Sequence, residues 1–392
     1  MTPQARVQAA IEVLDAIIAA ARGGGASADR ILAEWFRARR YAGSGDRRAV
    51  RELVYRAVRH CGEVPASGRA ALLALTRDDA ALAALFDGSR HAPQPIVNEE
   101  HMAQPGLAPA WLEAALAASG IAAADAAALL GRAPLDVRVN ALKADREAIE
   151  LPEAGEPLLA AQGLRFAHGT PVEQWQAFRD GSIEVQDGGS QLTCEAVRAQ
   201  PGETVIDLCA GAGGKTLALA AAMGNRGRLI ACDVDRARLS RLGPRAERAG
   251  ATCIETRLLN PAREAETLTD LAGKADAVLV DAPCSGTGTW RRNPEARWRL
   301  SEKEVARYAA IQARLLDLAA SLVRPGGRLV FVTCSLLDQE GADQAQGFLT
   351  RHSAWQVDPL QLGAGTARGG GLRFDPAHDG TDGFFVARFI SP

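Results

Sequence analysis

The first part of the chain carries apolar residues at helical spacing. Val7, Ile11 and Leu14 recur every three or four positions, so a helix there has one apolar face. The same pattern, broken by polar or glycine-rich segments, predicts helices at residues 4–22, 27–39, 46–61 and 68–85. No alternation typical of strands interrupts them. Residues 1–90 are therefore expected to form a small all-α domain.

The pattern changes further along the chain. Residues 91–106 lie in a stretch rich in proline and polar residues, which predicts a linker. Residues 107–200 mix a short helix at 110–118 with extended pieces. They are expected to form a small α+β segment that leads into the next domain.

From residue 203 onward, short apolar strands alternate with longer helices. This order is typical of a parallel sheet with helices on both faces. The sequence therefore predicts an α/β, Rossmann-like domain over residues 201–392. Its expected strands are residues 204–208, 228–233, 252–255, 276–281, 328–333 and 384–389.

The composition is typical of a globular protein. Of the 392 residues, 47% are hydrophobic and 23% are charged, with a net charge of -2. No run reaches the roughly 20 apolar residues of a membrane span, and the N-terminus lacks the pattern of a signal peptide. Seven cysteines lie far apart without a CxxC pair, so neither a metal site nor a disulfide framework is expected. Reduced thiols favour a cytoplasmic protein.

Arginine is concentrated near the N-terminus. Residues 1–60 contain eleven arginines, against six aspartates and glutamates. A local excess of positive charge is what proteins use to bind the phosphates of nucleic acids. A solvated helical surface would show the same excess, and charge alone does not separate the two interpretations.

A glycine-rich loop follows the first expected strand of the sheet, in the sequence DLCAGAGGKT at 207–216. Glycines at the carboxyl end of a strand let the backbone approach a ligand, and the next helix offers free N–H groups. The loop fits neither GxGxxG nor the longer Walker A pattern, which leaves a nucleotide-like ligand without a pyrophosphate. Asp233 ends the second strand, where a carboxylate accepts hydrogen bonds from ribose hydroxyls, and Asp281 ends a later one. Such residues also cap loops, but the ordered set favours a nucleoside cofactor.

Two cysteines follow strands of the same sheet, Cys284 in DAPCSGTG (281–288) and Cys334 in TCS (333–335). Ligands of such sheets bind outside the carboxyl ends of the strands, so both thiols are expected to face the cofactor. A small buried hydrophobic residue is the simpler interpretation of a lone cysteine. That interpretation is assigned to Cys61, Cys194, Cys232 and Cys253, while Cys209 is assigned to the packing of the glycine-rich loop.

With these motifs assembled, the chain resembles the Fmu/Sun-type RNA cytosine-5 methyltransferases of the bacterial ribosomal RNA branch, over roughly residues 107–390. Further matching motifs are RVNALK (138–143), VQDGGSQL (185–192) and DGFFVARF (382–389). The resemblance implies a class I methyltransferase fold with S-adenosylmethionine as cofactor. It assigns the cofactor site to Cys209, Ala210, Gly211, Ala212, Gly213, Gly214, Lys215, Asp233 and Asp281.

The resemblance also implies roles for the cysteines. Carbon 5 of cytosine is a poor nucleophile until a thiolate adds to carbon 6. The family pattern makes Cys334 this nucleophile and Cys284 the thiol that assists release. Asp281 is the candidate that protonates or hydrogen-bonds N3 of the base. DNA cytosine methyltransferases place their nucleophile in a Pro-Cys motif, so Cys284 remains the alternative.

The N-terminal region looks like the NusB-type RNA-binding helical domain of the same branch, chiefly over residues 44–54. Its candidate RNA contacts are Arg47, Arg48 and Arg51. A second candidate is the loop after the Pro-Cys motif, where Arg291 and Arg292 would bind RNA and Trp298 would pack in a core or cap a helix. One departure lies after the third strand. Where the family has an aspartate near the adenine, the segment 255–260 offers Arg257 or Asn260.

The expected function is therefore methylation of carbon 5 of a cytosine in RNA, most simply 16S ribosomal RNA, by a monomer. The same chemistry on transfer RNA stays open. An inactive RNA-binding assembly factor is a further alternative, although the set of Lys215, Asp281, Cys284 and Cys334 is complete. A small-molecule methyltransferase is disfavoured by the paired cysteines and the basic helical region.

Overall fold

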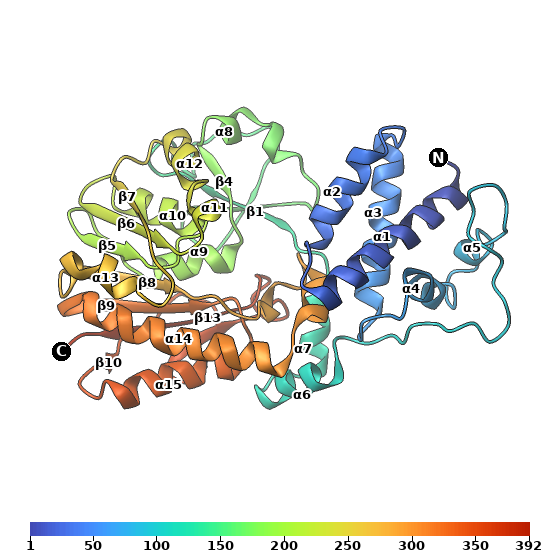
Figure 1. Ribbon diagram of the computed structural model, residues 1–392. Helices are drawn as coiled ribbons and strands as arrows, with labels where there is room; N and C mark the ends of the chain where they lie inside the picture. Colours follow the sequence, from blue (N-terminus) through green and yellow to red (C-terminus); the bar gives the residue numbers. More distant parts are fainter. The chain divides into compact units, whose positions relative to one another are not determined.

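The computed structural model describes residues 1–392, and the chain divides into two compact units (Figure 1). The first contains Met1–Gly131 together with Thr289–Glu302. The second contains Arg132–Gly288 and Lys303–Pro392. This division differs from the boundaries expected from the sequence, because the first unit continues beyond residue 106 and includes a segment that follows the Pro-Cys motif.

The first unit is helical, as the spacing of its apolar residues predicts. The expected helix at 68–85 is broken in two, because the Thr76 hydroxyl donates to Leu73 O (2.7 Å) and the Asp79 side chain accepts from Leu82 N (2.9 Å). Each bond satisfies a helix end. The helices are α1 (Pro3–Gly23), α2 (Ala28–Ala38), α3 (Ser44–His60), α4 (Gly68–Leu75), α5 (Ala80–Ala83), α6 (Ala110–Ala118) and α7 (Ala123–Ala127).

Helix α1 lies at the centre of this unit and buries Val7, Leu14 and Ile17 against α2, α3 and α4. Helix α4 can approach it closely because it begins with a glycine. A Cβ atom on Gly68 would lie 2.3 Å from Ile11 O, so any other residue would push the two helices apart. The Asp15 side chain accepts from the Gly68 N–H (2.6 Å) at the same contact.

The stretch expected as a linker is bound to the helical unit. Arg69 on α4 pairs with Glu100 and donates to the Gln94 and Pro95 carbonyls at 3.0 and 3.1 Å. Ala103 N donates to Ala70 O (3.0 Å). The segment is therefore held against the helical unit by hydrogen bonds and is not a free linker.

Residues 289–302 complete the first unit. Within them the turn η5 (Pro294–Arg299) places Glu295 and Arg297 at the ends of two helices. Glu295 accepts from Ala28 N (2.9 Å), the first residue of α2. Arg297, 0% exposed, donates to Val58 O (2.6 Å) and Cys61 O (2.9 Å), carbonyls at the end of α3. Unsatisfied N–H and C=O groups at helix ends are bonded in this way by a distant part of the chain.

The burial of this segment changes one interpretation of the sequence. Trp298 packs in the core of the first unit, as expected. Arg291 is only 8% exposed and Arg292 is half-buried, so the two do not form the open basic loop that the sequence suggested. The reason is the long-range capping of α2 and α3, which draws the whole loop into the unit.

The second unit is built on a nine-stranded sheet in the order β11-β12-β13-β9-β8-β5-β6-β7, with β10 paired to β13. Strands β9, β8, β5, β6 and β7 are parallel, whereas β13 is antiparallel to β9. The strands are β5 (Thr204–Asp207), β6 (Arg228–Asp233), β7 (Ile254–Leu258), β8 (Ala275–Asp281), β9 (Val323–Thr333), β10 (Gln356–Val357), β11 (Thr366–Arg368), β12 (Gly371–Phe374) and β13 (Phe384–Ile390). Two expected strands are displaced at their starts. The third begins two residues later than expected, at Ile254, and the strand expected at 328–333 begins five residues earlier, at Val323.

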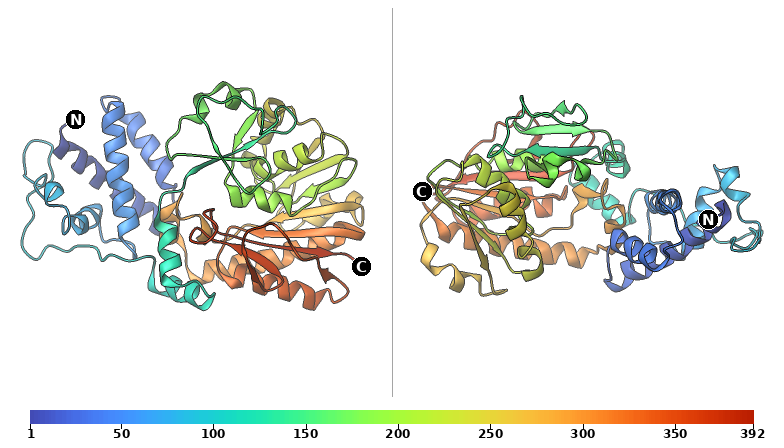
Figure 2. Two further views of the ribbon diagram at one scale, coloured as in Figure 1. Left: turned by 180° about the vertical axis from the view of Figure 1, so that it is seen from behind. Right: turned by 90° about the horizontal axis from the view of Figure 1, so that it is seen from above.

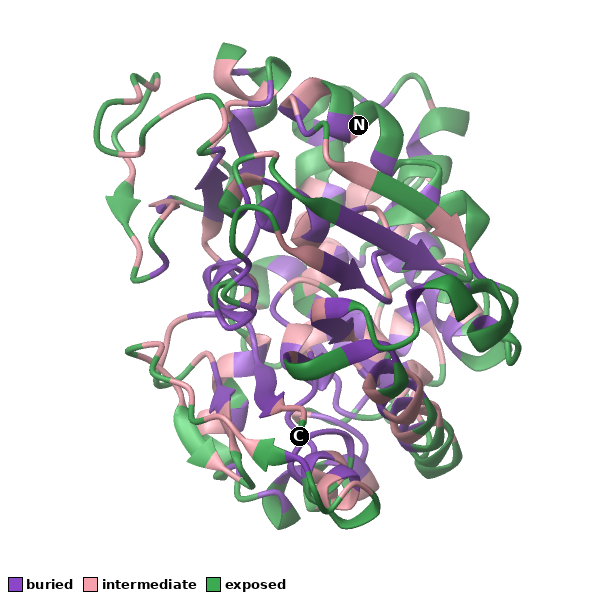
Figure 3. Ribbon diagram, turned by 90° about the vertical axis from the view of Figure 1, so that its left-hand side faces the viewer, coloured by how far each residue is buried: buried purple, intermediate pink, exposed green.

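Helices cover both faces of this sheet (Figures 1 and 2). Successive residues of β5 point to opposite faces. Val205 packs with α9, α10 and α12, and Ile206 packs with α14 and α15. This burial on both faces explains why the central strands are continuously apolar. Figure 3 shows the buried residues in purple. The helices are α8 (Gln176–Arg179), α9 (Gly188–Glu195), α10 (Gly214–Ala222), α11 (Arg236–Leu239), α12 (Leu242–Ala249), α13 (Glu264–Thr267), α14 (Glu302–Leu322) and α15 (Ala342–Arg351).

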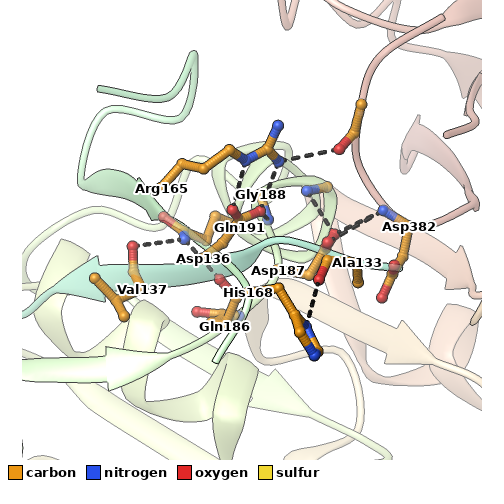
Figure 4. A network of polar contacts seen from close by, with 12 residues as sticks. Ala133, Asp136, Val137, Arg165, His168, Gln186, Asp187, Gly188, Gln191 and Asp382 are labelled. Atoms are coloured by element: carbon orange, nitrogen blue, oxygen red, sulfur yellow. Dashed lines mark hydrogen bonds and ion pairs between the residues drawn. The ribbon is translucent and has the colours of Figure 1, made fainter. Parts of the chain in front are cut away.

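A smaller antiparallel sheet, β2-β3-β1-β4, precedes the large one, with β1 (Leu135–Val139), β2 (Glu156–Pro157), β3 (Gly163–Phe166) and β4 (Ile183–Val185). A polar network connects it to the segment before β13 (Figure 4). Buried Asp136 pairs with Arg165 at 2.7 and 2.9 Å and accepts from Gly188 N (2.9 Å). Asp187 accepts from Asp382 N (3.1 Å). The motifs VQDGGSQL and DGFFVARF, far apart in sequence, are therefore bonded to each other.

The fold contains neither a helix that could span a membrane nor a cluster of metal ligands. No helix combines the length and the apolar character that crossing a bilayer requires. No group of three His, Cys, Asp or Glu side chains is arranged to hold a metal ion.

Candidate active site

The predicted site residues gather at one edge of the large sheet. Strands β5, β6, β8 and β9 are parallel, so their carboxyl ends, with Asp207, Asp233, Asp281 and Thr333, lie at the same edge. Ligands of open α/β sheets bind at this edge. The position agrees with the expectation from the sequence.

The glycine-rich loop bends back on the end of β6. Gly211 N donates to the Asp233 carboxylate (2.7 Å). Gly211 and Gly213 have φ angles of 55° and 87°, and a Cβ on Gly213 would lie 2.1 Å from Leu242 Cδ1. Only glycine fits there. The loop leads into α10 at Gly214, and the N–H groups of a first helical turn have no acceptor within the helix.

Asp233 is 6% exposed, and its other oxygen accepts from Asp235 N (2.7 Å). These backbone bonds hold the carboxylate at the strand end, and each oxygen keeps a further lone pair. A backbone cradle of glycines beside a fixed carboxylate suits the ribose and the charged tail of a nucleoside cofactor. The residues present therefore fit S-adenosylmethionine.

Lys215 on α10 and Asp281 at the end of β8 form an ion pair of 2.7 Å. Burial acts to lower the pKa of Lys215. The charge of Asp281 and the hydrogen bond that it accepts from Lys215 oppose burial, and the pKa stays above the ordinary value of lysine. The side chain thus remains a cation beside the cysteines.

Cys284 and Cys334 come from separate loops and meet with their sulfur atoms 3.3 Å apart. Two bonds hold these loops together, Gly288 N to Cys334 O (3.0 Å) and Leu336 N to the Thr287 hydroxyl (2.8 Å). The hydrogen bond with Cys334, followed by burial, raises the pKa of Cys284 well above the ordinary value of cysteine.

The other cysteines are of a different kind. Cys61, Cys194 and Cys232 are buried and Cys253 is half-buried. Burial raises the pKa of Cys209 well above its usual value, and neighbouring carboxylates add to this effect. A thiol held protonated in this way is a poor nucleophile, which agrees with its expected packing role.

Two residues at the edge were not singled out from the sequence. Asp207 is fully buried and accepts from the Thr216 hydroxyl (2.7 Å), and burial raises the pKa of this carboxyl to about 7. Glu340 lies beneath the two cysteine loops. Acidic residues are common along the chain, and nothing in their local sequence distinguishes these two.

Arg257 and Asn260, the two candidates for the contact with the adenine, lie in and shortly after β7. Arg257 is held by Glu255 and Asp270, which raise the pKa of its guanidinium. Asn260 is exposed. The pairing of Arg257 leaves Asn260 as the more available of the two polar groups.

In the first unit, Arg47, Arg48 and Arg51 line a cleft of about 670 Å³ between α2 and α3, together with Arg37 and Arg40. Arg47 lies over the Phe36 ring at 5.7 Å and donates to Ala42 O (2.9 Å). The three candidates from the sequence thus share one surface with two further arginines.

Comparison with known proteins decides the family. Residues 195–390 match the family model described as 16S rRNA methyltransferase RsmB/F. The chain belongs to this family. The resemblance found in the motifs and the expected α/β methyltransferase fold are thereby confirmed, while the NusB-type likeness stays a prediction.

Curated relatives include the probable ribosomal RNA small subunit methyltransferase B of Synechocystis, 35% identical over 268 residues (64% of this chain and 59% of the relative). Ribosomal RNA small subunit methyltransferase B of Xanthomonas campestris is 37% identical over 236 residues, 60% of this chain and 53% of the relative. The matches thus span between half and three-fifths of these relatives.

Among solved structures, PH0851 covers 99% of both chains with a TM-score of 0.75 at 24% identity. A methyltransferase homologue from Pyrococcus horikoshii covers 68% of this chain and 90% of its own, with a TM-score of 0.58 and 25% identity. The likeness to PH0851, which covers 99% of this chain, includes the fold of the helical unit.

Proposed function

We propose that this protein transfers a methyl group from S-adenosylmethionine to carbon 5 of a cytosine in 16S ribosomal RNA. The observation that carries the proposal is the pair of thiols 3.3 Å apart beside the Lys215–Asp281 ion pair. The relatives named ribosomal RNA small subunit methyltransferase B support ribosomal RNA as the substrate.

The cofactor site would consist of the loop Cys209–Lys215 with Asp233 and Asp281. When bound, S-adenosylmethionine supplies an electrophilic methyl group. Cys334 adds through its thiolate to carbon 6, so a C–S bond forms and the C5=C6 π electrons move toward carbon 5. Because N3 is an acceptor, Asp281 would act on it as a carboxyl group that carries a proton: it donates that proton or a hydrogen bond to N3 and so stabilises the charge that develops in the ring. Carbon 5 is then able to accept the methyl group.

Release reverses the addition. Loss of the proton from carbon 5 to a base returns an electron pair to the ring, the C5=C6 bond re-forms, and the bond to Cys334 breaks. The departing sulfur carries the negative charge. Cys284, held as a thiol 3.3 Å away, donates a hydrogen bond to it and stabilises it. A raised pKa makes Cys284 a poor nucleophile, and the family pattern assigns that role to Cys334.

Bisulfite sequencing of RNA from a deletion strain tests the function. We expect one 5-methylcytosine of 16S ribosomal RNA to disappear and to return when the intact gene is restored. Loss confined to transfer RNA would move the substrate to that class. No change in any RNA would refute the proposal.

The cofactor assignment predicts that Asp233→Ala weakens binding of S-adenosylmethionine. Two charge-assisted hydrogen bonds to ribose would be lost, on the order of 1.5–3 kcal/mol each. Isothermal titration calorimetry measures the effect. Asp235→Ala is the control, because Asp235 is exposed and caps α11 from the same loop. Equal affinities in the Asp233 variant and the parent would contradict the assignment.

RNA affinity is assigned to the arginine cleft of α2 and α3. Replacing Arg47, Arg48 and Arg51 by alanine is expected to weaken RNA binding and to flatten its dependence on salt, because fewer counterions are released. Filter binding over a salt series measures both.

The matched control removes the same charge elsewhere in the first unit, at Arg30, Arg56 and Arg77. Arg30 and Arg56 are paired with Glu34 and Asp79, and Arg77 is exposed. If both triple variants weaken binding equally, the cleft has no special role and only bulk charge matters.

A further inference from the structure

The two cysteine loops meet on one buried carboxylate. Glu340 ends the turn η6 (Asp338–Glu340) and is 0% exposed. Ser285 donates to it through its backbone N–H (2.8 Å) and through its hydroxyl. Ser335 donates through its hydroxyl (2.7 Å), and the Gln312 amide on α14 lies at 3.3 Å.

The two serines connect Glu340 to the two cysteine loops. Ser285 directly follows Cys284, and Ser335 directly follows Cys334. Their hydroxyls are also 3.2 Å from each other. Glu340 therefore bonds each loop one residue away from its thiol, in addition to the two bonds that join the loops directly.

The negative charge of Glu340 also lies close to the Cys284 thiol. All its donors are neutral groups, so none cancels the negative charge. The charged groups around the thiols are Glu340 below Cys284, and Lys215 with Asp281 beside Cys334. Lys215 is paired with Asp281 at 2.7 Å. A negative charge near a thiol opposes loss of its proton.

We propose that Glu340 is a positioning residue, which holds the two cysteine loops side by side and whose charge keeps the proton on Cys284. This inference rests on the proposed function, in which Cys284 has to be a thiol when the bond to Cys334 breaks. No covalent step passes through Glu340. Its effect on the pKa of Cys284 adds to those of Cys334 and burial.

The test titrates Cys284 without RNA. In the Cys334→Ala protein, the rate of alkylation of Cys284 by iodoacetamide is followed against pH by mass spectrometry of its peptide. Glu340→Gln keeps the size of the side chain and removes its charge. We expect the midpoint of the titration to fall by about one pH unit.

Glu264→Gln is the matched control. Glu264 is a buried carboxylate of the same unit, paired with Arg314 and separate from the cysteine loops. It should leave the midpoint unchanged. A midpoint in Glu340→Gln equal to that of the parent would overturn the proposal.

Ser335→Ala serves where Glu340→Gln does not fold, as judged by circular dichroism. It keeps the charge and removes the hydrogen bond from the Cys334 loop to the Glu340 carboxylate. We expect the Cys284 midpoint to stay and formation of the RNA adduct to slow about tenfold or more. Adduct formation at the parent rate would overturn the positioning role.

Failure of the proposed function can be distinguished from failure of this inference, because the two are measured separately. In that case the otherwise unmodified protein forms no adduct with any RNA, whereas the Cys284 titration still reports whether Glu340 controls the thiol.

Discussion

Cys334→Ala is expected to abolish methyl transfer and to form no covalent adduct with RNA. The thiolate that adds to carbon 6 is lost, and carbon 5 is then not nucleophilic enough to accept a methyl group. We expect a fall in rate of about 10⁴-fold or more, as for removal of a nucleophile in other enzymes that act through covalent intermediates. Transfer of labelled methyl groups to RNA measures it.

Cys284→Ala is the companion variant, and its expected result differs in kind. Methyl transfer still occurs once, but the sulfur of Cys334 departs without the thiol that lies 3.3 Å from it. The protein should therefore accumulate on RNA as a band that survives denaturing electrophoresis. Each variant removes one sulfur atom, so each is the control for the other.

The same gel would also reveal the opposite assignment of the two cysteines. An adduct that persists in Cys334→Ala and vanishes in Cys284→Ala would make Cys284 the nucleophile, as in the DNA enzymes. Adducts in neither variant, with a normal adduct in the parent trapped by a mechanism-based cytosine analogue, would mean that both thiols are required for addition.

Arg297→Ala is expected to destabilise the first unit by on the order of 3–5 kcal/mol. The guanidinium is buried and donates to carbonyls at the end of α3, and burial lowers its pKa to about 10. Its removal leaves these carbonyls without a donor and opens a cavity beside Trp298. Scanning calorimetry and limited proteolysis at α1–α3 measure the loss.

Arg30→Ala is the control for this variant, because the Arg30 side chain is exposed and pairs only with Glu34 along α2. It should leave the melting temperature unchanged. A melting temperature of Arg297→Ala equal to that of the parent would show that the segment 289–302 does not hold α2 and α3 together.

Local patterns predicted most of the secondary structure. The helix at 110–118 and the strand at 228–233 lie where the spacing of apolar residues placed them. Two of the misplaced boundaries have local polar causes. Thr76 and Asp79 bond to nearby backbone and split one expected helix, and Asn225 Oδ1 accepts from Thr252 N (2.9 Å), which keeps that residue out of β7.

The site was predictable in part for a topological reason. Parallel strands end at one edge, so the residues directly after them converge whatever the loops do. Asp233, Asp281, Cys284 and Cys334 follow this rule. Glu340 does not, because it approaches the cysteines from a turn that no strand end defines.

By itself, the sequence determined the class of fold, the edge at which ligands would bind and the family, because strand order and short motifs are local properties. The tertiary structure alone decided which polar groups meet. It drew residues 289–302 into the first unit, buried Arg291 and placed Glu340 between two serines that are 50 residues apart. Hydrogen bonds between distant segments depend on how the chain folds back on itself, and the spacing of residues along the sequence carries no information about that.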